Sequence, residues 1–508
     1  MLARVHSEAL SGLESHPIGV EADVVPAAPA FTIVGLPDAA VQESRERVRT
    51  AIVNSGYDFP SRRITVNLAP ADVRKEGPAF DLPIALALLC ATGQARAALQ
   101  GAAAIGELGL DGAVRPVAGV LAVAQSARRR GLETLLVPAG NAGEAALVEG
   151  LTVLPAATLR QAAGLLEGLP HPAVERPDPA DLLATGADAD LDLADVLGQK
   201  RAKRVLEIAV AGAHNLLMVG PPGAGKTMLA RRVPSIMPPL SVDEAIDVTR
   251  VYSVAGLLPA GTALVARRPF RAPHHTISAV GLVGGGGTPR PGEVSLAHLG
   301  VLFLDEFPEF RLSALEGLRQ PLEDGDVTIS RALTSVTFPA RLMLVAAMNP
   351  CPCGFRGDKG RACTCPAHRL DVYGHRLSGP LLDRIDLRIE VPRLTPRERR
   401  GQEQGERSAV VRERVALARQ RQRRRFAGAG ITANAHLSGR GLRELCRVEP
   451  AALAALDRAY DTLRLSSRAC DRVTKVAQSI ADLEGADVVT EQHVLESLSY
   501  RDAVMGRA

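Results

Sequence analysis

Hydrophobic and polar residues recur with two different periods along the first third of the chain. Short apolar runs such as FTIVGL, RRITVNLAP and TLLVPA alternate with stretches in which apolar residues recur at helical spacing, such as PDAAVQESRERVRTAIVNSG and VLAVAQSARRRG. Alternation every second residue is typical of strands, and a period of about 3.6 residues is typical of helices. Residues 1–168 are therefore predicted to form an α/β domain.

The pattern changes twice further along the chain. Residues 169–191 are rich in Pro, Asp and Ala without a clear period, which indicates a linker. Residues 192–395 alternate strand-like and helical stretches again. Residues 396–508 are charged and helical and end in TEQHVLESLSYRDA, where Thr490 is expected to cap the last helix. The fold class predicted is α/β with a helical C-terminal domain.

The composition is that of a globular protein with several domains. The chain has 508 residues, of which 46% are apolar, and no apolar run free of charge reaches the length that spans a membrane. The first residues do not form a secretory signal, and the few scattered cysteines do not form a disulfide framework, so we expect a cytoplasmic protein. The net charge of +4 neither requires nor excludes a nucleic acid partner.

One strand-like run leads into a phosphate-binding loop. NLLMV is followed by GPPGAGKT and then by the helical stretch MLARRV, which is the order of elements that a P-loop requires. In such a loop Lys226 reaches the β- and γ-phosphate oxygens of ATP and the Thr227 hydroxyl binds Mg²⁺. A plain Gly-Pro turn before a helix is the alternative. The predicted nucleotide-binding residues are Gly220, Pro221, Pro222, Gly223, Ala224, Gly225, Lys226 and Thr227.

Two further strand-like runs end in polar residues suited to the same site. GVLFLDEF delivers Asp305, a candidate Mg²⁺ ligand, and Glu306, a candidate general base that could polarise the attacking water. RLMLVAAMNP ends in Asn349, whose amide could orient that water or sense the γ-phosphate. The alternatives are an acidic pair that starts a loop and a turn-forming Asn-Pro. Downstream of a P-loop, the combination predicts an ATP hydrolase.

Four of the seven cysteines lie close together in NPCPCGFRGDKGRACTC. They are Cys351, Cys353, Cys363 and Cys365. Four thiolates suit a structural Zn²⁺, and the polar, Gly-rich segment between the two Cys-x-Cys pairs would need a staple to stay ordered. Reduced thiols or disulfides are the alternatives. His368 and His375 lie nearby as spare ligands, although such histidines are more often surface residues.

Several segments of the chain carry a family resemblance. Arg384 in SGPLLDRIDL and Arg468 in LSSRACDRV could neutralise charge in a transition state, although one arginine means little in an arginine-rich chain. With the P-loop, the acidic strand end and the Asn-tipped strand, these segments resemble AAA+ ATPases. RPFRAPHHTIS, GEVSLAHLGVLFLDEFPEF, NPCPCG and ADLEG resemble, more narrowly, the ComM/YifB family of magnesium-chelatase-like ATPases, and this likeness runs nearly end to end.

This resemblance implies a fold, an assembly and an activity. Residues 192–395 would form an AAA+ core with a parallel sheet flanked by helices, and residues 396–508 its helical lid. Arg384 would be an arginine finger that acts on a neighbouring subunit, Arg468 a lid sensor and Asn349 the first sensor. The family's implied assembly is a homohexameric ring, and its implied activity is ATP-driven helicase or branch migration on DNA during natural transformation.

The N-terminal domain resembles the catalytic domain of Lon protease. VRKEGPAFDLPIALALL and GELGLDGAVRPVAGVLAVAQSARRRGLETLLVP follow the two active-site segments of Lon. Lon requires a serine nucleophile activated by a lysine. The matching positions hold Ala79 and, at about the position of the lysine, Leu121. The resemblance therefore implies a domain without protease activity, which serves as a structural or DNA-facing platform.

Four stretches are candidates for contact with DNA. RRPFRAPHHTIS and GLVGGGGTPRPGE could line the pore of a ring, and DVTISRALTSVTFPA alternates like a β-hairpin with Arg331 near its tip. Arginines there could follow a phosphate backbone, whereas the alternative is a solvated loop. Residues 419–426, RQRQRRRF, are a basic run, which is usually a solvated helix face.

The function expected is that of a motor on single-stranded or branched DNA. We expect it to bind DNA without sequence specificity and not to associate with a membrane. A magnesium-chelatase-type ATPase that remodels a protein partner is the main alternative, and an ATP-dependent scaffold is another. The four-cysteine clip favours the DNA motor, because the resemblance does not extend this clip to the chelatase subunits proper.

Overall fold

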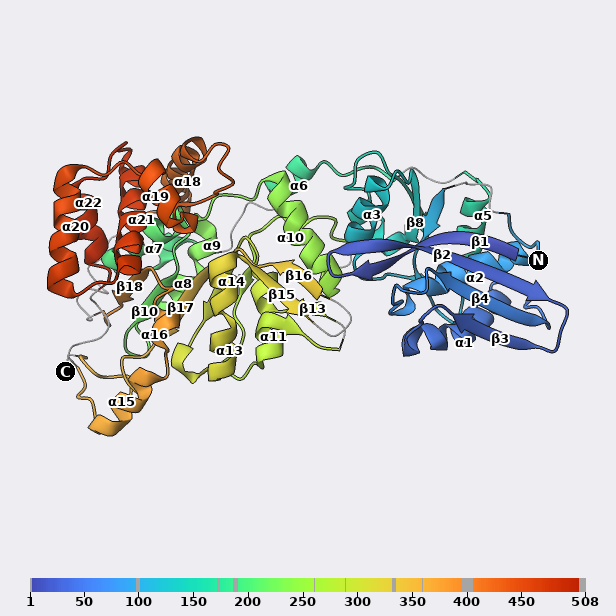
Figure 1. Ribbon diagram of the computed structural model, residues 1–508, viewed down its shortest axis with the longest axis horizontal. Coiled ribbons are helices and arrows are strands. Elements are labelled where there is room, and N and C mark those ends of the chain that lie inside the picture. The colour runs from blue at the N-terminus through green and yellow to red at the C-terminus, as the bar shows by residue number, and fades with distance from the viewer. Residues whose placement is uncertain are drawn as a thin grey trace. The chain divides into compact units, whose positions relative to one another are not determined.

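The protein divides into two compact units. The computed structural model describes residues 2–96, 101–170, 174–185, 191–259, 261–287, 289–330, 335–358, 360–394 and 405–501. The first unit comprises Met1–Gly186, Ser241–Arg267 and Ser330–Phe338, and the second comprises Ala187–Leu240, Arg268–Ile329 and Pro339–Ala508 (Figure 1). Both units are mixed α/β, which confirms the predicted fold class. The expected domain boundaries stay predictions.

The first unit is built on a seven-stranded sheet of order β3-β4-β2-β1-β5-β8-β9. Its strands are β1 (Leu2–Ser11), β2 (Glu14–Val25), β3 (Ala30–Val34), β4 (Arg63–Ala69), β5 (Ala102–Ala104), β8 (Thr134–Pro138) and β9 (Thr152–Ala156). Strand β2 pairs antiparallel with β1 and β4, with Ser11 opposite Glu14 at the β1–β2 turn, and the remaining pairs are parallel. A separate short pair consists of β6 (Glu107–Leu108) and β7 (Val114–Arg115).

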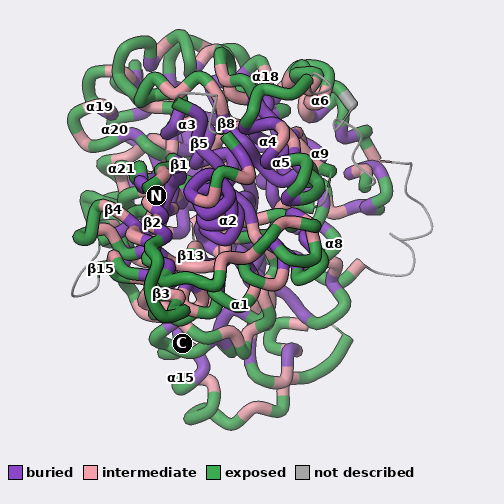
Figure 2. The backbone as a smooth tube through the Cα atoms, turned by 90° about the vertical axis from the view of Figure 1, so that its right-hand side faces the viewer, coloured by how far each residue is buried: buried purple, intermediate pink, exposed green. Residues whose placement is uncertain are grey.

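Helices cover this sheet and bury its apolar residues. They are α1 (Ala39–Asn54), α2 (Asp81–Ala91), α3 (Val120–Arg129), α4 (Ala142–Ala145), α5 (Leu159–Leu166) and α10 (Val242–Ala255). Every residue of α2 is buried, as Figure 2 shows in purple. Helix α10 comes from the middle of the chain and packs against α3. A further short helix, α6 (Pro179–Thr185), lies in the expected linker, where Pro179 is its first residue and Asp178 accepts a hydrogen bond from the Ala180 N–H.

The second unit is built on a five-stranded parallel sheet of order β11-β14-β17-β10-β18. Its strands are β10 (Leu216–Val219), β11 (Phe270–Arg271), β14 (Val301–Leu304), β17 (Met343–Met348) and β18 (Leu387–Glu390). All residues of β10 and β14 are buried, as a parallel sheet covered on both faces requires. Because all five strands run the same way, their carboxyl ends meet at one edge of the sheet, where ligands bind in such folds.

Short helices and hairpins connect these strands. They are α7 (Lys200–Gly212), α8 (Lys226–Arg231), α9 (Val233–Ile236), α11 (Ala279–Val283), β12 (Gly284–Gly285), β13 (Arg290–Pro291), α12 (Glu293–Leu296), α13 (Leu312–Gly317), α14 (Arg319–Asp324), β15 (Asp326–Ser330), α15 (Ala367–His375) and α16 (Gly379–Leu382). Strand β16 (Ser335–Pro339) belongs, apart from Pro339, to the first unit. Strands β15 and β16 lie where the alternating pattern predicts a hairpin, but Arg331 at its tip lies outside the described residues.

The C-terminal part of the second unit is helical, as predicted. Its helices are α18 (Ser408–Arg425), α19 (Gly439–Leu445), α20 (Pro450–Leu463), α21 (Ser467–Glu484) and α22 (Glu491–Leu498). Thr490 caps α22, as expected, and its backbone N–H donates to Nδ1 of His493 at 3.0 Å. Helix α21 packs against α7, α18 and α22 and thereby joins the lid to the sheet. Within the ranges that the structure describes, no helix is long and apolar enough to cross a membrane.

Candidate nucleotide-binding site

The predicted P-loop joins β10 to α8 at the carboxyl edge of the parallel sheet. Gly223 and Gly225 have φ angles of 76° and 94°, a left-handed region that glycine adopts without steric cost. A Cβ atom on Gly220 would lie 2.1 Å from the backbone oxygen of Val391, so no side chain fits there. The glycines of GPPGAGKT therefore permit both the tight turn and the close approach of a neighbouring segment.

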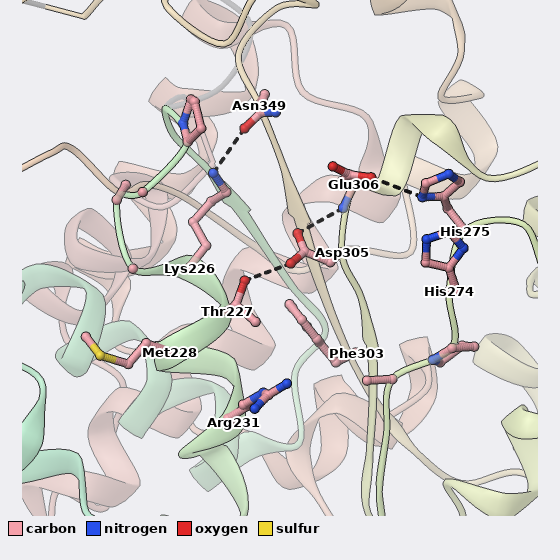
Figure 3. Close-up of a pocket in the computed structure, with 16 residues that line it drawn as sticks. Lys226, Thr227, Met228, Arg231, His274, His275, Phe303, Asp305, Glu306 and Asn349 are labelled. Carbon is pink, nitrogen blue, oxygen red and sulfur yellow. Dashed lines mark hydrogen bonds and ion pairs between the residues drawn. The ribbon is translucent and has the colours of Figure 1, made fainter.

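Lys226 folds back over this loop. Its Nζ donates hydrogen bonds to the carbonyl oxygens of Gly220 at 2.6 Å and Pro221 at 3.1 Å, and to Oδ1 of Asn349 at 3.2 Å (Figure 3). Only 8% of Lys226 is exposed, and burial lowers the pKa of its amine, against the attraction of Asp305. A buried ammonium group needs oxygen partners, and phosphate oxygens could replace these neutral ones.

Thr227, Asp305 and Glu306 meet beside the loop. The Thr227 hydroxyl donates to Oδ2 of Asp305 at 2.7 Å, and the Glu306 N–H donates to Oδ1 of Asp305 at 2.9 Å. Glu306 has a φ of 53°, so the chain turns sharply directly after the strand end. The Thr227 hydroxyl and the Asp305 carboxylate are oxygen donors of the kind that Mg²⁺ prefers, so this pair fits the predicted metal.

A cavity of about 680 Å³ encloses these groups. It is lined by Pro222, Gly223, Ala224, Gly225, Lys226, Thr227, Asp305, Glu306 and Asn349, which the sequence analysis selected. Sequence reasoning missed Met228, Arg231, Phe303, His274 and His275, which also line it. The two histidines follow β11, which has only two residues and leaves no strand pattern. Because β11 lies next to β14, the residues after it reach the same edge of the sheet.

The two candidate arginines lie in a second cavity of the same unit. Arg384 and Arg468 line a cavity of about 660 Å³ together with Arg319, Arg341, Arg472 and Lys475. Acidic residues lie among them, including Glu323 and Asp386. The structure thus brings Arg384 and Arg468 together, but among the described residues neither lines the cavity of the P-loop.

The guanidinium of Arg384 has partners within its own chain. Its Nε donates to the Arg319 carbonyl at 3.1 Å and its Nη1 to the Pro380 carbonyl at 2.7 Å. Nη2 forms an ion pair with Glu323, and only 14% of the Arg384 side chain is exposed. An external anion would therefore have to compete with Glu323 for this arginine.

The four clustered cysteines converge after β17, as expected of a metal clip. All four sulfurs lie within 4.8 Å of one another, and the three pairs among Cys351, Cys353 and Cys363 are 3.3, 3.7 and 3.6 Å apart. These distances exclude disulfides between those three. Zn–S bonds of about 2.3 Å place tetrahedral sulfurs about 3.8 Å apart, so the set fits Zn²⁺. Hydrogen bonds from the backbone of Phe355 and Thr364 lower the pKa of the Cys353 thiol to about 6.

The basic run at residues 419–426 is largely engaged inside the lid. Arg419 donates to the Val210 carbonyl at 3.2 Å, and Arg421 donates to the Asp482 carbonyl at 2.9 Å. Arg425 forms an ion pair with the buried carboxylate of Asp482. Only Arg423 and Arg424 among these arginines are exposed. The run therefore holds α18 against α7 and α21, and Arg419, Arg421 and Arg425 lie in neither the expected solvated face nor a free DNA-binding face.

The two positions that match the Lon dyad lie in packed surroundings. Ala79 is in a short 3₁₀ turn, and its carbonyl accepts a hydrogen bond from Gly106 at 2.9 Å. Leu121 is fully buried in α3, and its N–H donates to the carboxyl group of Glu144 at 3.3 Å. Burial raises the pKa of Glu144, against hydrogen bonds from Ser253 and Asn141. A methyl and an isobutyl group thus stand where a hydroxyl and an amine would act.

Comparisons with protein families cover most of the chain. Residues 192–399 match the family described as magnesium chelatase, subunit ChlI. Residues 20–141 match the family described as subunit ChlI of Mg-chelatase, and residues 405–501 match the C-terminal part of magnesium chelatase subunit ChlI.

Similar proteins extend over the whole chain. The sequence is 44% identical to the uncharacterized protein YifB of Escherichia coli strain K12 over 503 residues, 98% of this chain and 97% of that protein. It is 44% identical to the competence protein ComM of Haemophilus influenzae over 509 residues, 99% of this chain and 98% of that protein. It is also 32% identical to Lon protease 2 of Bacillus subtilis over 155 residues, 28% of this chain and 27% of that protein.

Proposed function

The chain belongs to the ComM/YifB family of magnesium-chelatase-like AAA+ ATPases, and on this premise we propose that it is an ATP-driven motor on DNA. The observation that carries the proposal is the first cavity, where the P-loop, Asp305, Glu306 and Asn349 converge. These are the groups that bind a nucleoside triphosphate and direct a water molecule at its terminal phosphate.

Five polar residues of the cavity have a role in this proposal. Lys226 exchanges its carbonyl partners for β- and γ-phosphate oxygens, and Asn349, which already contacts Lys226, orients the attacking water. Glu306 takes a proton from that water. Thr227 and Asp305 would hold Mg²⁺, which when bound neutralises charge on the phosphates. The chain's own residues thus bind ATP, orient the attacking water and accept its proton.

We place Arg384 and Arg468 at the active site of a neighbouring subunit. Both line the second cavity of their own chain and not the cavity of the P-loop, which favours contact with a γ-phosphate across an interface between subunits. A heterologous interface forms a ring when its rotation closes, and the ring that the family resemblance implies is a homohexamer. In this arrangement the phosphates of the bound nucleotide displace Glu323 from Arg384.

DNA is the partner that we propose for such a ring. The relative ComM is called a competence protein, and competence is the ability of a cell to take up DNA. Arg290, the first residue of β13, is exposed and pairs with Gly285 of β12, so it suits a non-specific contact with a phosphate backbone. The substrates proposed are single-stranded or branched recombination intermediates, and the motor would act on them in the cytoplasm.

We also propose that the four cysteines hold a structural Zn²⁺. Cys351 follows Asn349 by two positions, and Tyr373 of α15 donates a hydrogen bond to the Asn349 carbonyl at 3.1 Å. A metal at this point would order the loop between β17 and α15 and thereby fix the position of Asn349. Its role is structural, since four thiolates leave no open coordination position.

A magnesium-chelatase-type ATPase that remodels a protein partner is the second candidate. The observation that favours it is the match of residues 192–399 to the family described as the ChlI subunit of magnesium chelatase. Such a protein would turn over ATP in response to its protein partner and would not respond to DNA.

A branch-migration assay tests the proposed function. A three-strand junction with a labelled strand is incubated with the protein and ATP, and Glu306→Gln serves as a matched control that keeps the size of the side chain. The proposal expects strand exchange with the unchanged protein only. Failure of the unchanged protein on every branched substrate, despite ATP turnover, would contradict branch migration.

A further inference from the structure

Two histidines of RAPHHTIS lie in the nucleotide cavity, although this motif pointed to a DNA-facing loop. Nδ1 of His275 lies 3.0 Å from Oε2 of Glu306 (Figure 3). His274 makes a different polar contact, since its Nδ1 lies 3.0 Å from the Thr276 hydroxyl, while its ring lies against that of His275 with the centres 4.1 Å apart. We propose that His275 is a positioning residue that orients the Glu306 carboxylate for the deprotonation of water, an inference that rests on the proposed ATP hydrolysis.

The backbone that presents His275 is held at both ends. Before it, Arg271 of β11 forms two hydrogen bonds with the Glu293 carboxylate, at 2.6 and 2.7 Å. After it, the Ile277 N–H donates to the His274 carbonyl at 3.0 Å, and Ser278 caps α11. The imidazole is therefore offered to Glu306 from a segment with fixed geometry rather than from a free loop.

The imidazole itself rests against an aromatic neighbour. The rings of His275 and Phe310 meet edge to face with their centres 6.4 Å apart, and Phe310 is buried. This contact limits the rotation of the imidazole. A carboxylate oxygen only accepts, so the contact with Glu306 uses an Nδ1–H donor.

Glu306 needs such a partner because little else restrains its side chain. The side chain is 53% exposed, and Glu306 itself has a positive φ directly after the strand end. An exposed glutamate samples several rotamers, and only some of them aim the carboxylate at a water in line with the γ-phosphate. Binding of Oε2 by His275 selects one orientation and leaves the other oxygen able to accept a proton.

The hydrolysis step forms one bond to the γ-phosphorus of ATP and breaks another. The water oxygen forms a bond to the γ-phosphorus, and the bond from that phosphorus to the bridging oxygen breaks with its electron pair passing to ADP. One water proton passes to the carboxylate of Glu306, while His275 keeps its own proton and only holds the acceptor in place. Because His275 contacts Glu306 and the P-loop residues bind ATP, we expect His275 to influence the rate of hydrolysis and not the affinity for ATP.

The test compares ATP hydrolysis by His275→Ala, His275→Asn and His274→Ala in the full chain, with nucleotide affinity measured separately. His275→Ala is expected to lower kcat about tenfold, while the KM for ATP and the affinity for a fluorescent ATP analogue change less than twofold. The amide of asparagine can replace Nδ1–H, so His275→Asn should recover a large part of kcat. His274→Ala keeps the contact with Glu306 and should have a higher kcat than His275→Ala.

Two results would overturn the inference: an unchanged kcat in His275→Ala, or His275→Asn no better than His275→Ala when both bind the analogue normally. Glu306→Gln separates this inference from the proposed function. If Glu306→Gln hydrolyses ATP at the normal rate, the general base of the proposed function is wrong. If it is inactive while His275→Ala is normal, only the role of His275 is wrong.

Discussion

The Thr227 hydroxyl lies 2.7 Å from the Asp305 carboxylate, although 78 positions separate the two residues in the sequence. The P-loop follows β10 and Asp305 follows β14, and β17 lies between these two strands in the sheet. Asn349 at the end of β17 completes the row through its contact with Lys226. Three neighbouring strand ends thus assemble the site, which allows separate tests of its parts.

Loss of the P-loop amine should strongly weaken nucleotide binding. Lys226→Ala removes the ammonium group that is poised to bind phosphate oxygens, and we expect its affinity for ATP to fall by more than tenfold. Titration with a fluorescent ATP analogue measures this change. Arg231→Ala, which removes a charge at the wall of the same cavity, is the comparison. Equal affinities of Lys226→Ala and the unchanged protein would refute the assignment of the P-loop.

Arginines of the second cavity should act on a neighbouring subunit. Arg384→Ala and Arg468→Ala are expected to bind ATP normally and to lose most of their turnover, about a hundredfold or more for Arg384. In a mixture of Lys226→Ala and Arg384→Ala chains, some interfaces combine an intact P-loop with an intact arginine. Random mixing makes these about a quarter of all interfaces in a ring, so hydrolysis should reappear.

Recovery on mixing is measured by steady-state hydrolysis at a fixed total concentration of protein. The same recovery is expected when Arg468→Ala replaces Arg384→Ala, because the two arginines share one cavity. If the mixture stays as inactive as its components, although both variants assemble, the two arginines do not complete a partner's site.

The four-cysteine cluster should contain about one zinc ion per chain. Elemental analysis of the purified protein measures this content, and Cys353→Ser should lose the metal and lower the melting temperature. Cys470→Ser is the matched control, because Cys470 lies on α21 outside the cluster and its loss should leave the zinc content unchanged. A protein without zinc that melts at the same temperature with and without a chelator would contradict a structural metal.

The lid should depend on one buried ion pair. Asp482 is fully buried and accepts hydrogen bonds from Arg425 and, at 2.9 Å, from Asn434. Asp482→Ala leaves the guanidinium of Arg425 without its carboxylate, which we expect to cost about 3–5 kcal/mol of stability. Urea unfolding measures the difference, with the exposed Asp487→Ala as control. Equal unfolding midpoints for the two variants would show that the pair does not stabilise the lid.

The strands of the ATPase core could be predicted because their patterns are simple. Runs such as LLMV and VLFL are fully buried, and each ends in a residue whose chemistry marks the site. Strands β1 and β2 show no such pattern, although they are the longest of the strands that the structure describes. Ser7, Glu8 and Ser15 are buried there, and the carboxylate of Glu8 is bound by the Ser15 hydroxyl at 2.8 Å and by Arg130. Hydrogen bonds and ion pairs with residues distant in sequence offset the cost of burying these polar side chains. The pattern of hydrophobic and polar positions does not reveal such partners.

The candidate site was predictable to the extent that strand ends mark it. Lys226, Asp305, Glu306 and Asn349 lie together as the motifs indicate. The contact of His275 with Glu306 depends on the two-residue strand β11, and the shared cavity of Arg384 and Arg468 depends on how the lid packs. Both relationships join segments that are distant in sequence, so neither motif spacing nor composition could predict them.

The most direct test of the central claim is ATP hydrolysis measured with no DNA, with single-stranded DNA and with a four-way junction, each at two salt concentrations. The account predicts that DNA, and the junction most strongly, stimulates turnover, and that stimulation weakens at the higher salt because contacts with the phosphate backbone are electrostatic. Steady turnover that no DNA changes at either salt would contradict a DNA motor and would favour an ATPase that acts on a protein partner.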